Sequence, residues 1–374
     1  MSHILVTGGA GFIGSHLVDA LIERGHQVRV LDSLVEQVHG PHADRPAHLH
    51  PSAEFVRGDV RDVEAMRRAL QGIEVIYHEA AEVGVGQSMY EVTRYVGGNT
   101  YATSVLLEIL ANEKHTIKRL IVASSMSIYG EGAYRCPQHG RVHPFLRPEE
   151  QLARKDWEMK CSECGQPVEI MGTPEDKPLF PTSIYAISKM DQELMCLSIG
   201  RAYNIPAVAL RYFNVYGPRQ ALSNPYTGVA AIFSGRLLNG NPPVIFEDGQ
   251  QSRDFTHVSD IVQANLLALE RDEAVYEVFN VGTGRALSVC DVAMALINEL
   301  KVRIQPEIVG GFRAGDIRHC VADIGKARRL LGYEPRVKFE DGLTELVTWV
   351  KGQHADDRVE QARHELAQRG LIRA

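Results

Sequence analysis

Short apolar runs alternate with longer stretches of helical periodicity along the first half of the chain. The first run, Ile4-Leu5-Val6-Thr7, is followed by apolar residues at helical spacing until Gly25. Further apolar runs occupy residues 27–31, 54–57, 75–77 and 120–123. Strands separated by helices in this way predict an α/β fold with a doubly wound parallel sheet of the Rossmann kind. Polar residues follow each run, where ligands of such sheets bind.

The strand–helix rhythm loosens after Pro218. Short apolar runs mix with helical stretches around residues 244–246 and 300–323. We therefore expect a dinucleotide-binding domain over 1–217, to which 257–281 returns, and a smaller mixed α/β substrate-binding lobe over 218–256 and 282–350. The remaining residues, 353–374, are charged and amphipathic and predict a C-terminal tail helix on the solvated surface.

Composition narrows the functional classes. The 374 residues carry a net charge of -7, which argues against a nucleic-acid partner. The apolar runs are too short to span a membrane, so no membrane partner is expected. Six cysteines are too few for a disulfide scaffold in a chain of this length. The glycine-rich segment that begins at Gly8 leaves no room for a cleaved signal peptide. These features predict a cytoplasmic protein.

A glycine-rich turn joins the first strand to the first helix, and the second strand ends on Asp32. Glycines let the backbone approach a pyrophosphate at the helix N-terminus, and the acid accepts hydrogen bonds from the adenosine ribose. This arrangement predicts a bound dinucleotide. Because Asp32 would repel a 2′-phosphate, NAD is favoured over NADP. The residues predicted to bind it are Gly8, Gly11, Phe12, Ile13, Gly14 and Asp32.

A tyrosine and a lysine stand four residues apart in Pro181-Thr182-Ser183-Ile184-Tyr185-Ala186-Ile187-Ser188-Lys189. On a helix, Tyr185 and Lys189 would share one face, and an ammonium beside a phenol lowers the pKa of that phenol. Tyr185 is therefore a candidate base. The pair alone is a weak signal, since the same spacing is common by chance, and it gains weight from the dinucleotide motif upstream.

These segments together resemble the extended short-chain dehydrogenase/reductase family, in its NAD-dependent sugar-nucleotide epimerase/dehydratase branch. The similarity runs from residue 3 to about residue 350. It rests on these motifs: Thr7–Gly14, Gly58-Asp59-Val60, His78-Glu79-Ala80-Ala81, Asn99, Ser125 with Tyr129-Gly130, Tyr185 with Lys189, Leu210–Arg219, Arg253-Asp254-Phe255 and Arg313–Asp316.

The resemblance implies roles for residues outside the glycine turn. Ser125, Tyr185 and Lys189 would be catalytic, and Tyr185 and Lys189 would also contact the cofactor. Asp59 and Val60 would hold adenine, and Ala80, Ala81 and Asn99 would line the cofactor channel. A nucleoside-diphosphate sugar would contact Ser125, Asn214, Arg253 and Arg313, because a guanidinium suits a diphosphate. The family also implies a homodimer formed through helices near 88–113 and 183–203.

The chemistry of these groups predicts C4 epimerisation. Tyr185 would take the proton of a sugar hydroxyl while NAD⁺ accepts the carbinol hydride, and Ser125 would hydrogen-bond the reacting oxygen. In the dehydratase branch an Asp-Glu pair follows the catalytic Ser or Thr, but Met126 and Ser127 occupy those positions here. Hydride return to the opposite face is therefore expected. A UDP-sugar 4-epimerase, a 4-keto-sugar reductase and a catalytically silent NAD-binding regulator are the alternatives.

The segment between Tyr129 and Tyr185 is longer than the family needs, which indicates an insertion. It contains Cys136-Pro137-Gln138-His139 and Cys161-Ser162-Glu163-Cys164-Gly165. Three thiolates and an imidazole are the ligands of a closed tetrahedral zinc site. We expect structural zinc on Cys136, His139, Cys161 and Cys164, within an insertion over 136–165. The insertion and the loop 247–251 look like the group that includes dTDP-L-rhamnose 4-epimerase, which implies dTDP-L-rhamnose or dTDP-6-deoxy-L-talose as substrate.

Overall fold

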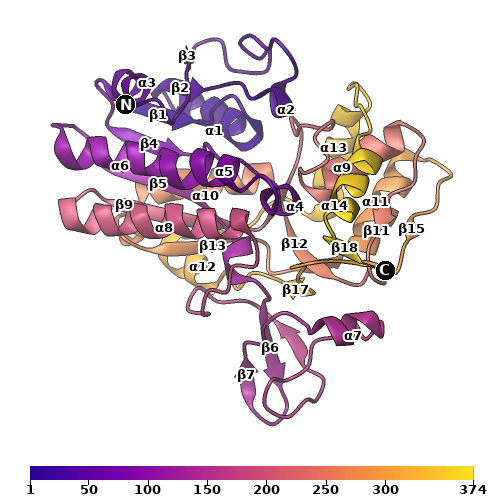
Figure 1. The fold of residues 1–374 in the computed structure, drawn as a ribbon. Coiled ribbons are helices and arrows are strands. Elements are labelled where there is room, and N and C mark those ends of the chain that lie inside the picture. Colours follow the sequence, from indigo (N-terminus) through magenta and orange to yellow (C-terminus); the bar gives the residue numbers. More distant parts are fainter. Residues whose placement is uncertain (374) are drawn as a thin grey trace.

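The computed structural model describes residues 1–373, and a seven-stranded parallel sheet forms its centre (Figure 1). The strand order is β13-β9-β5-β4-β1-β2-β3, so the chain winds outward in both directions from β1 and β4. The predicted doubly wound sheet is confirmed. Its strands are β1 (His3–Thr7), β2 (Gln27–Asp32), β3 (Glu54–Arg57), β4 (Val75–His78), β5 (Arg119–Ser125), β9 (Ala207–Tyr212) and β13 (Val278–Val281).

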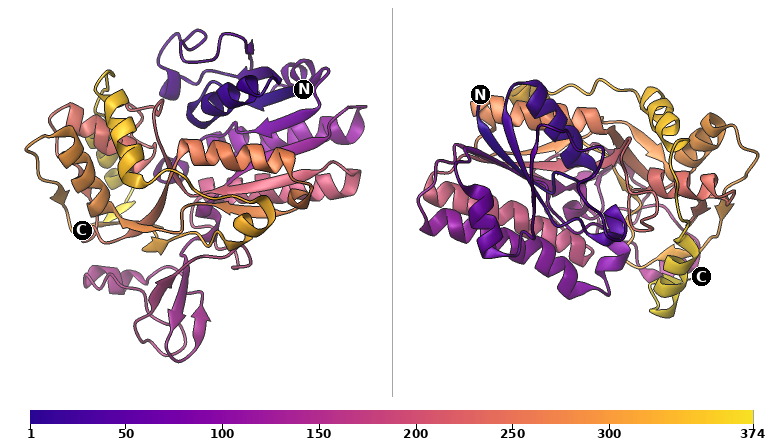
Figure 2. Two further views of the ribbon diagram at one scale, coloured as in Figure 1. Left: turned by 180° about the vertical axis from the view of Figure 1, so that it is seen from behind. Right: turned by 90° about the horizontal axis from the view of Figure 1, so that it is seen from above.

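Helices cover both faces of this sheet, because its strands are apolar on both sides. On β1, Ile4 and Val6 pack into the core under α1 and α10, whereas Leu5 packs into the core under α3, α6 and α8. The right-hand view of Figure 2 shows the two helical layers on either side of the sheet. These helices are α1 (Phe12–Glu23), α3 (Val63–Leu70), α6 (Ala102–Asn112), α8 (Ile184–Tyr203), α10 (Val258–Glu270) and α12 (Gly325–Leu331).

Short helical segments connect these elements. A π-helix, η1 (Val96–Tyr101), leads directly into α6, and a 3₁₀ turn, η2 (Met126–Tyr129), follows β5. The others are α2 (Glu36–His39), α4 (Val85–Ser88), α5 (Val92–Tyr95) and η3 (Asp272–Ala274).

A second lobe surrounds its own apolar core beside the carboxyl ends of the strands (Figure 1). Its largest sheet has the order β10-β12-β14, with β17 paired to β12, and two small sheets pair β11 with β15 and β16 with β18. Helices α9 (Val229–Leu238), α11 (Val289–Leu300) and α13 (Phe339–Val350) pack on it. The strands are β10 (Asn214–Tyr216), β11 (Val244–Ile245), β12 (Ser252–His257), β14 (Ala286–Ser288), β15 (Glu307–Ile308), β16 (Phe312–Arg313), β17 (His319–Cys320) and β18 (Ile372–Arg373).

The segment between η2 and α8 folds into a small unit of its own, which we call the insertion (residues 131–173). It projects below the two lobes in Figure 1. A three-stranded antiparallel sheet, β7-β6-β8, packs with a helix around a small core that contains Tyr134 and Met159. Its elements are β6 (Ala133–Cys136), β7 (Gly140–Val142), α7 (Glu149–Ala153) and β8 (Glu169–Met171).

The C-terminal tail differs from the solvated surface helix that its sequence indicated. Helix α14 (Val359–Gln368) buries Ala362 and Leu366, whereas its charged residues face outward. After the helix, β18 pairs antiparallel with β16, opposite Phe312 and Arg313. The amphipathic pattern was correct, but its apolar side packs against the protein. Within residues 1–373, no helix is long and apolar enough to cross a membrane.

Candidate active site

A cleft of about 660 Å³ runs along the carboxyl edge of the large sheet and continues between the two lobes. The glycine turn and Asp32 line one part of it, and Ser125, Tyr185, Asn214, Arg253 and Arg313 line the rest. Residues far apart in the sequence therefore meet in one place, at the strand ends where ligands of such sheets bind.

The glycine turn is compact enough to require its glycines. Gly8 has φ +69°, and a Cβ there would lie 2.8 Å from the Ala80 backbone. At Gly14 a Cβ would lie 2.3 Å from the Gly8 carbonyl oxygen. This close packing starts α1 directly behind the turn, so the free amides at its N-terminus face the cleft beside Phe12 and Ile13.

Asp32 stands at the end of β2, next to the glycine turn. One carboxylate oxygen accepts a hydrogen bond from the Ala10 amide at 3.0 Å, and the other accepts one from the Leu34 amide at 2.9 Å. Asp32 lines the cleft, and His39 Nε2 lies 3.9 Å from one of its carboxylate oxygens. A carboxylate fixed in this way can accept further hydrogen bonds from ribose hydroxyls.

The remaining predicted cofactor residues occupy different settings. Asp59, Val60, Ala80 and Ala81 line the cleft, and a hydrogen bond from Arg61 lowers the pKa of Asp59. Asn99 does not line it. Its amide donates to Ser188 Oγ at 2.8 Å, and its carbonyl oxygen accepts from the Glu82 amide at 2.7 Å. Asn99 therefore ties the loop after β4 to α8 from within the protein.

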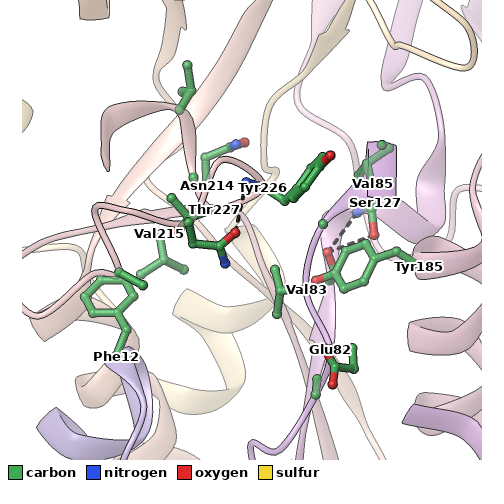
Figure 3. Close-up of a pocket in the computed structure, with 18 of the residues that line it drawn as sticks. Phe12, Glu82, Val83, Val85, Ser127, Tyr185, Asn214, Val215, Tyr226 and Thr227 are labelled. Carbon is green, nitrogen blue, oxygen red and sulfur yellow. Dashed lines mark hydrogen bonds between the residues drawn. The ribbon is translucent and has the colours of Figure 1, made fainter. Parts of the chain in front are cut away.

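Helix α8 brings Tyr185 and Lys189 to the cleft. Its N-cap is Ser183, whose hydroxyl accepts a hydrogen bond from the Ala186 amide, so Tyr185 lies in the first turn and Lys189 one turn later. The Tyr95 ring packs edge-on against the Tyr185 ring with centroids 6.5 Å apart. Tyr185 and Ser127 are close neighbours in Figure 3.

The electrostatics of the pair differ from the simple expectation. Burial raises the pKa of the Tyr185 phenol, and only the hydrogen bond with Ser125 opposes that rise. Burial also lowers the pKa of Lys189 to about 8, and its ammonium donates to Gln192 Oε1 at 2.8 Å.

Two carboxylates in the cleft were not identified from the sequence. Glu79 is buried next to Ala80, accepts a hydrogen bond from the Tyr212 hydroxyl at 2.8 Å, and has a pKa raised to about 7 by burial. Glu82 lines the cleft in Figure 3 and forms an ion pair of 2.7 Å with Arg94. Their position after a strand end was the available signal.

Among the residues predicted to hold a substrate, Asn214 lies across the cleft from Tyr185 in Figure 3. The side-chain amide oxygen of Asn214 is buried and has no hydrogen-bond partner among residues 1–373, as expected of an acceptor that binds a ligand. Figure 3 shows Asn214 near Tyr226 and Thr227, which also line the cleft and were not identified from the sequence. The tail contributes Ala362 and Leu366 to the same wall.

Away from the cleft, the four predicted metal ligands meet in the insertion. Their ligand atoms all lie within 4.8 Å of one another. Cys136 Sγ lies 3.7 Å from Cys164 Sγ, and Cys161 Sγ lies 3.4 Å from His139 Nδ1. A tetrahedron with metal–sulfur bonds of about 2.3 Å has edges of about 3.8 Å, so the cluster fits a tetrahedral ion. The second ring nitrogen of His139 lies 3.7 Å from Glu163.

Comparison with known proteins places this geometry among related chains. Residues 4–154 and 161–282 match the family described as NAD dependent epimerase/dehydratase. The chain is 35% identical over 349 residues to the dTDP-L-rhamnose 4-epimerase of Burkholderia thailandensis, covering 93% of this chain and 94% of the relative.

Two solved structures have the same fold. One is the UDP-glucose 4-epimerase of Thermotoga maritima with UDP-glucose, at 34% identity and a TM-score of 0.75, covering 93% of this chain and 98% of the other. The second is the UDP-glucuronic acid 4-epimerase of Bacillus cereus with UDP-glucuronic acid and NAD. It is 29% identical, has a TM-score of 0.76, and the match covers 93% of this chain and 99% of the other.

Proposed function

The chain belongs to the NAD-dependent epimerase/dehydratase family, and from that premise we propose that it is an NAD-dependent nucleoside-diphosphate-sugar 4-epimerase. One observation carries the proposal. A single cleft joins the dinucleotide turn to Tyr185 and to an unpaired buried acceptor on Asn214, while Met126 and Ser127 follow Ser125. The related 4-epimerases support the same reaction class.

Residues at the sheet edge hold the cofactor. The amides at the start of α1 bind the pyrophosphate, and the Asp32 carboxylate accepts hydrogen bonds from the ribose. These residues would hold NAD⁺, which would supply a reversible acceptor for the hydride of the sugar carbinol. Asp32 carries a negative charge at the position where NADP has its extra phosphate, which favours NAD.

Tyr185 removes and returns the proton of the sugar hydroxyl. Its hydroxyl is buried beside Ser125, so the transfer occurs away from bulk water. Ser125 donates a hydrogen bond to the same sugar oxygen and stabilises the charge that forms there. The Lys189 ammonium stabilises the phenolate form of Tyr185 by its charge.

The substrate side of the cleft binds the nucleotide portion. Arg253 and Arg313 provide guanidinium groups for the diphosphate, and the carbonyl oxygen of Asn214 accepts a hydrogen bond from the substrate. Between the two hydride transfers the keto-sugar must rotate while its diphosphate stays bound. Two arginines at the diphosphate suit that requirement.

The sugar is assigned by similarity. The Burkholderia thailandensis relative is named for dTDP-L-rhamnose, so dTDP-L-rhamnose and its C4 epimer, dTDP-6-deoxy-L-talose, are the first candidates. A UDP-sugar 4-epimerase is the second, since both structural neighbours carry UDP-sugars. NMR of products from a panel of dTDP- and UDP-sugars distinguishes these two candidates. Consumption of added NADH would instead indicate a 4-keto-sugar reductase, and no turnover of any sugar would indicate a silent NAD-binding regulator.

A structural zinc ion completes the insertion. The Cys136, His139, Cys161 and Cys164 ligand atoms fit a tetrahedron, and all four positions are filled by protein. Such an ion would stabilise a unit whose own apolar core is small. It lies outside the cleft and takes no part in the hydride chemistry.

A homodimer is the proposed assembly. Large apolar side chains are exposed on α5, η1 and α8, which lie within the helices that the family uses for pairing: Val92, Val96, Tyr101, Ile187 and Leu194. Burying such a surface would stabilise a pair of chains. Sedimentation of the purified protein tests this proposal, and a monomer at micromolar concentration would contradict it.

The cysteines of the described chain are all unpaired, in keeping with a reducing cytoplasm.

We propose that each segment has the function that the sequence predicted for it. Residues 1–217 and 257–281 hold the cofactor, 218–256 and 282–350 hold the substrate, and 136–165 hold the zinc ion. Crystals grown with NAD and a nucleoside diphosphate would test this division, and a diphosphate bound outside the second lobe would contradict it.

A further inference from the structure

The insertion meets the second lobe through buried ion pairs. Arg147 belongs to the insertion, and its side chain is 1% exposed. It donates two parallel hydrogen bonds of 2.9 Å to the Glu247 carboxylate. The same guanidinium donates to the Trp157 carbonyl oxygen. Glu247 belongs to the loop between β11 and β12, on the substrate side of the protein. A bidentate arginine–carboxylate pair fixes both position and orientation.

A second buried arginine extends this contact. The Arg318 side chain is 0% exposed and donates to Glu247 at 2.9 Å and to Asp248 at 2.7 Å. It also donates to Glu158 of the insertion at 2.5 Å. A hydrogen bond with His319, together with Arg318, lowers the pKa of Glu158 to about 2, so this carboxylate is ionised. At the base of the insertion, Glu131 accepts a hydrogen bond from the Arg318 amide at 2.6 Å.

The segment held in this way contacts Arg253 and carries Arg313, the two arginines of the cleft. Arg253 donates to the Arg318 carbonyl oxygen at 3.0 Å and to the Ile317 carbonyl oxygen at 2.7 Å. Arg313 donates to Asp316 at 2.9 Å, and its guanidinium lies 5.0 Å from the centre of the Phe246 ring. The backbone from 313 to 318 and the loop from 246 to 248 therefore set where both guanidinium groups point.

The charge distribution leaves Arg253 available for an anion, whereas Arg313 is paired with Asp316 at 2.8 Å. Arg253 has carbonyl oxygens as its close partners, and its nearest carboxylate, Asp316, lies 3.8 Å away. Arg147 and Arg318 are neutralised by Glu158, Glu247 and Asp248. The ion pairs of the insertion therefore hold the segment 313–318 in place and do not neutralise Arg253.

We propose that Arg147 and Glu158 of the insertion are positioning residues that hold Arg253 and Arg313 in register with the diphosphate of the substrate. This inference rests on the proposed function. The insertion acts on nucleotide affinity through the loop 246–248 and the segment 313–318. It does not act on the hydride chemistry, because Tyr185 and Ser125 belong to other elements. In Figure 1 the insertion lies against the β12 and β17 side of the second lobe.

The experiment measures the dissociation constants of UDP and dTDP by calorimetry, together with kcat and KM for the sugar nucleotide that the wild type converts. Arg147→Met should raise the nucleotide dissociation constant about tenfold and Glu158→Gln about threefold, which corresponds to a loss of rigidity rather than of a direct contact. NAD affinity and kcat should stay within about twofold of wild type. Arg141→Met is the matched control, because this insertion arginine forms an exposed pair with Asp176.

The outcomes distinguish a failure of the positioning role from a failure of the proposed function. If Arg147→Met and Glu158→Gln bind UDP and dTDP as the wild type does, the positioning role is wrong while the proposed function stands. If the wild type binds neither nucleotide, both fall together. Arg147→Met removes a buried charge, so its folding is checked by NAD binding and thermal unfolding. Should that variant not fold, Glu158→Gln decides alone, since the Glu158 side chain is 61% exposed and its loss is tolerated more easily.

Discussion

The hydroxyl of Ser127 donates a hydrogen bond of 2.9 Å to the hydroxyl of Ser125. The Ser127 amide also donates to the same oxygen, at 3.2 Å. Ser125 is therefore oriented as a donor whose own proton is free to reach Tyr185 or a substrate oxygen. Ser127 stands where dehydratases of this family have a carboxylic residue, and here it only orients its neighbour.

Tyr185→Phe should reduce turnover by about 10²- to 10⁴-fold, because it removes the group that accepts the sugar proton. NAD should remain bound, since the glycine turn and Asp32 are unchanged. Steady-state kinetics and cofactor fluorescence measure both effects. Ser127→Ala is the matched control, and it should cost much less than Ser125→Ala. Near-normal turnover by Tyr185→Phe would contradict its assigned role.

Asp32→Asn should narrow the preference for NAD over NADP by about tenfold or more. The substitution keeps the size of the side chain but removes the charge that repels a 2′-phosphate. It also weakens the hydrogen bonds from the Ala10 and Leu34 amides, so the NAD affinity itself should fall. Binding titrations with both cofactors test this prediction, and a wild type that binds them equally would refute the assignment.

The stability of the protein should depend on pH through Glu79. Burial raises the pKa of this carboxyl to about 7, above the ordinary value of 4.5. The native state therefore holds a proton that the unfolded state has lost, and the stability from Glu79 is complete below about pH 4.5 and lost as the pH rises through about 7. Glutamine at this position has no proton to lose. The free energy of unfolding of Glu79→Gln should therefore increase relative to that of the wild type as the pH rises over this range. A constant difference would contradict the buried environment.

The insertion should contain one zinc ion for each chain, measurable by elemental analysis of dialysed protein. Cys161→Ser should abolish this stoichiometry and unfold the insertion locally, because the small core around Tyr134 and Met159 cannot order it alone. Cys290→Ser, in the second lobe, should keep the metal. Full-length protein that is folded, active and free of stoichiometric metal would contradict the zinc site.

Local sequence signals predicted much of this structure. The glycine turn and the alternation of apolar runs determine how β1, α1 and β2 fold, since each signal depends on neighbouring residues only. The Ser183 cap is likewise a local feature, and it sets the start of α8 so that Tyr185 and Lys189 lie one turn apart. The Cys/His cluster of the insertion, whose four candidate ligand atoms meet in the structure, was also recognisable from short spacings.

Features that depend on contacts between distant segments were not predictable. Asn99, in the π-helix η1, is buried and accepts a hydrogen bond from the Glu82 amide, a contact that its own segment does not indicate. The burial of Glu79 follows from Tyr212, which is 133 residues away. The contact of Arg147 with Glu247 joins two loops separated by 100 residues. No pattern within one segment reports such pairs.

The central claim is that hydride returns to the carbon from which it was taken. Glu79 is hydrogen-bonded to Tyr212 and Glu82 is paired with Arg94, and neither of these two residues follows Ser125 in the chain. Water should therefore stay on the keto-sugar, and the net redox change should be nil.

The most direct measurement uses a nucleotide sugar labelled with deuterium at C4, followed by NMR and mass spectrometry of the product. We expect the product to have inverted C4 and to keep its deuterium, with no exchange from solvent. Loss of the label to solvent, or accumulation of a 4-keto-6-deoxy sugar, would contradict the epimerase and move the chain into the reductase or dehydratase class.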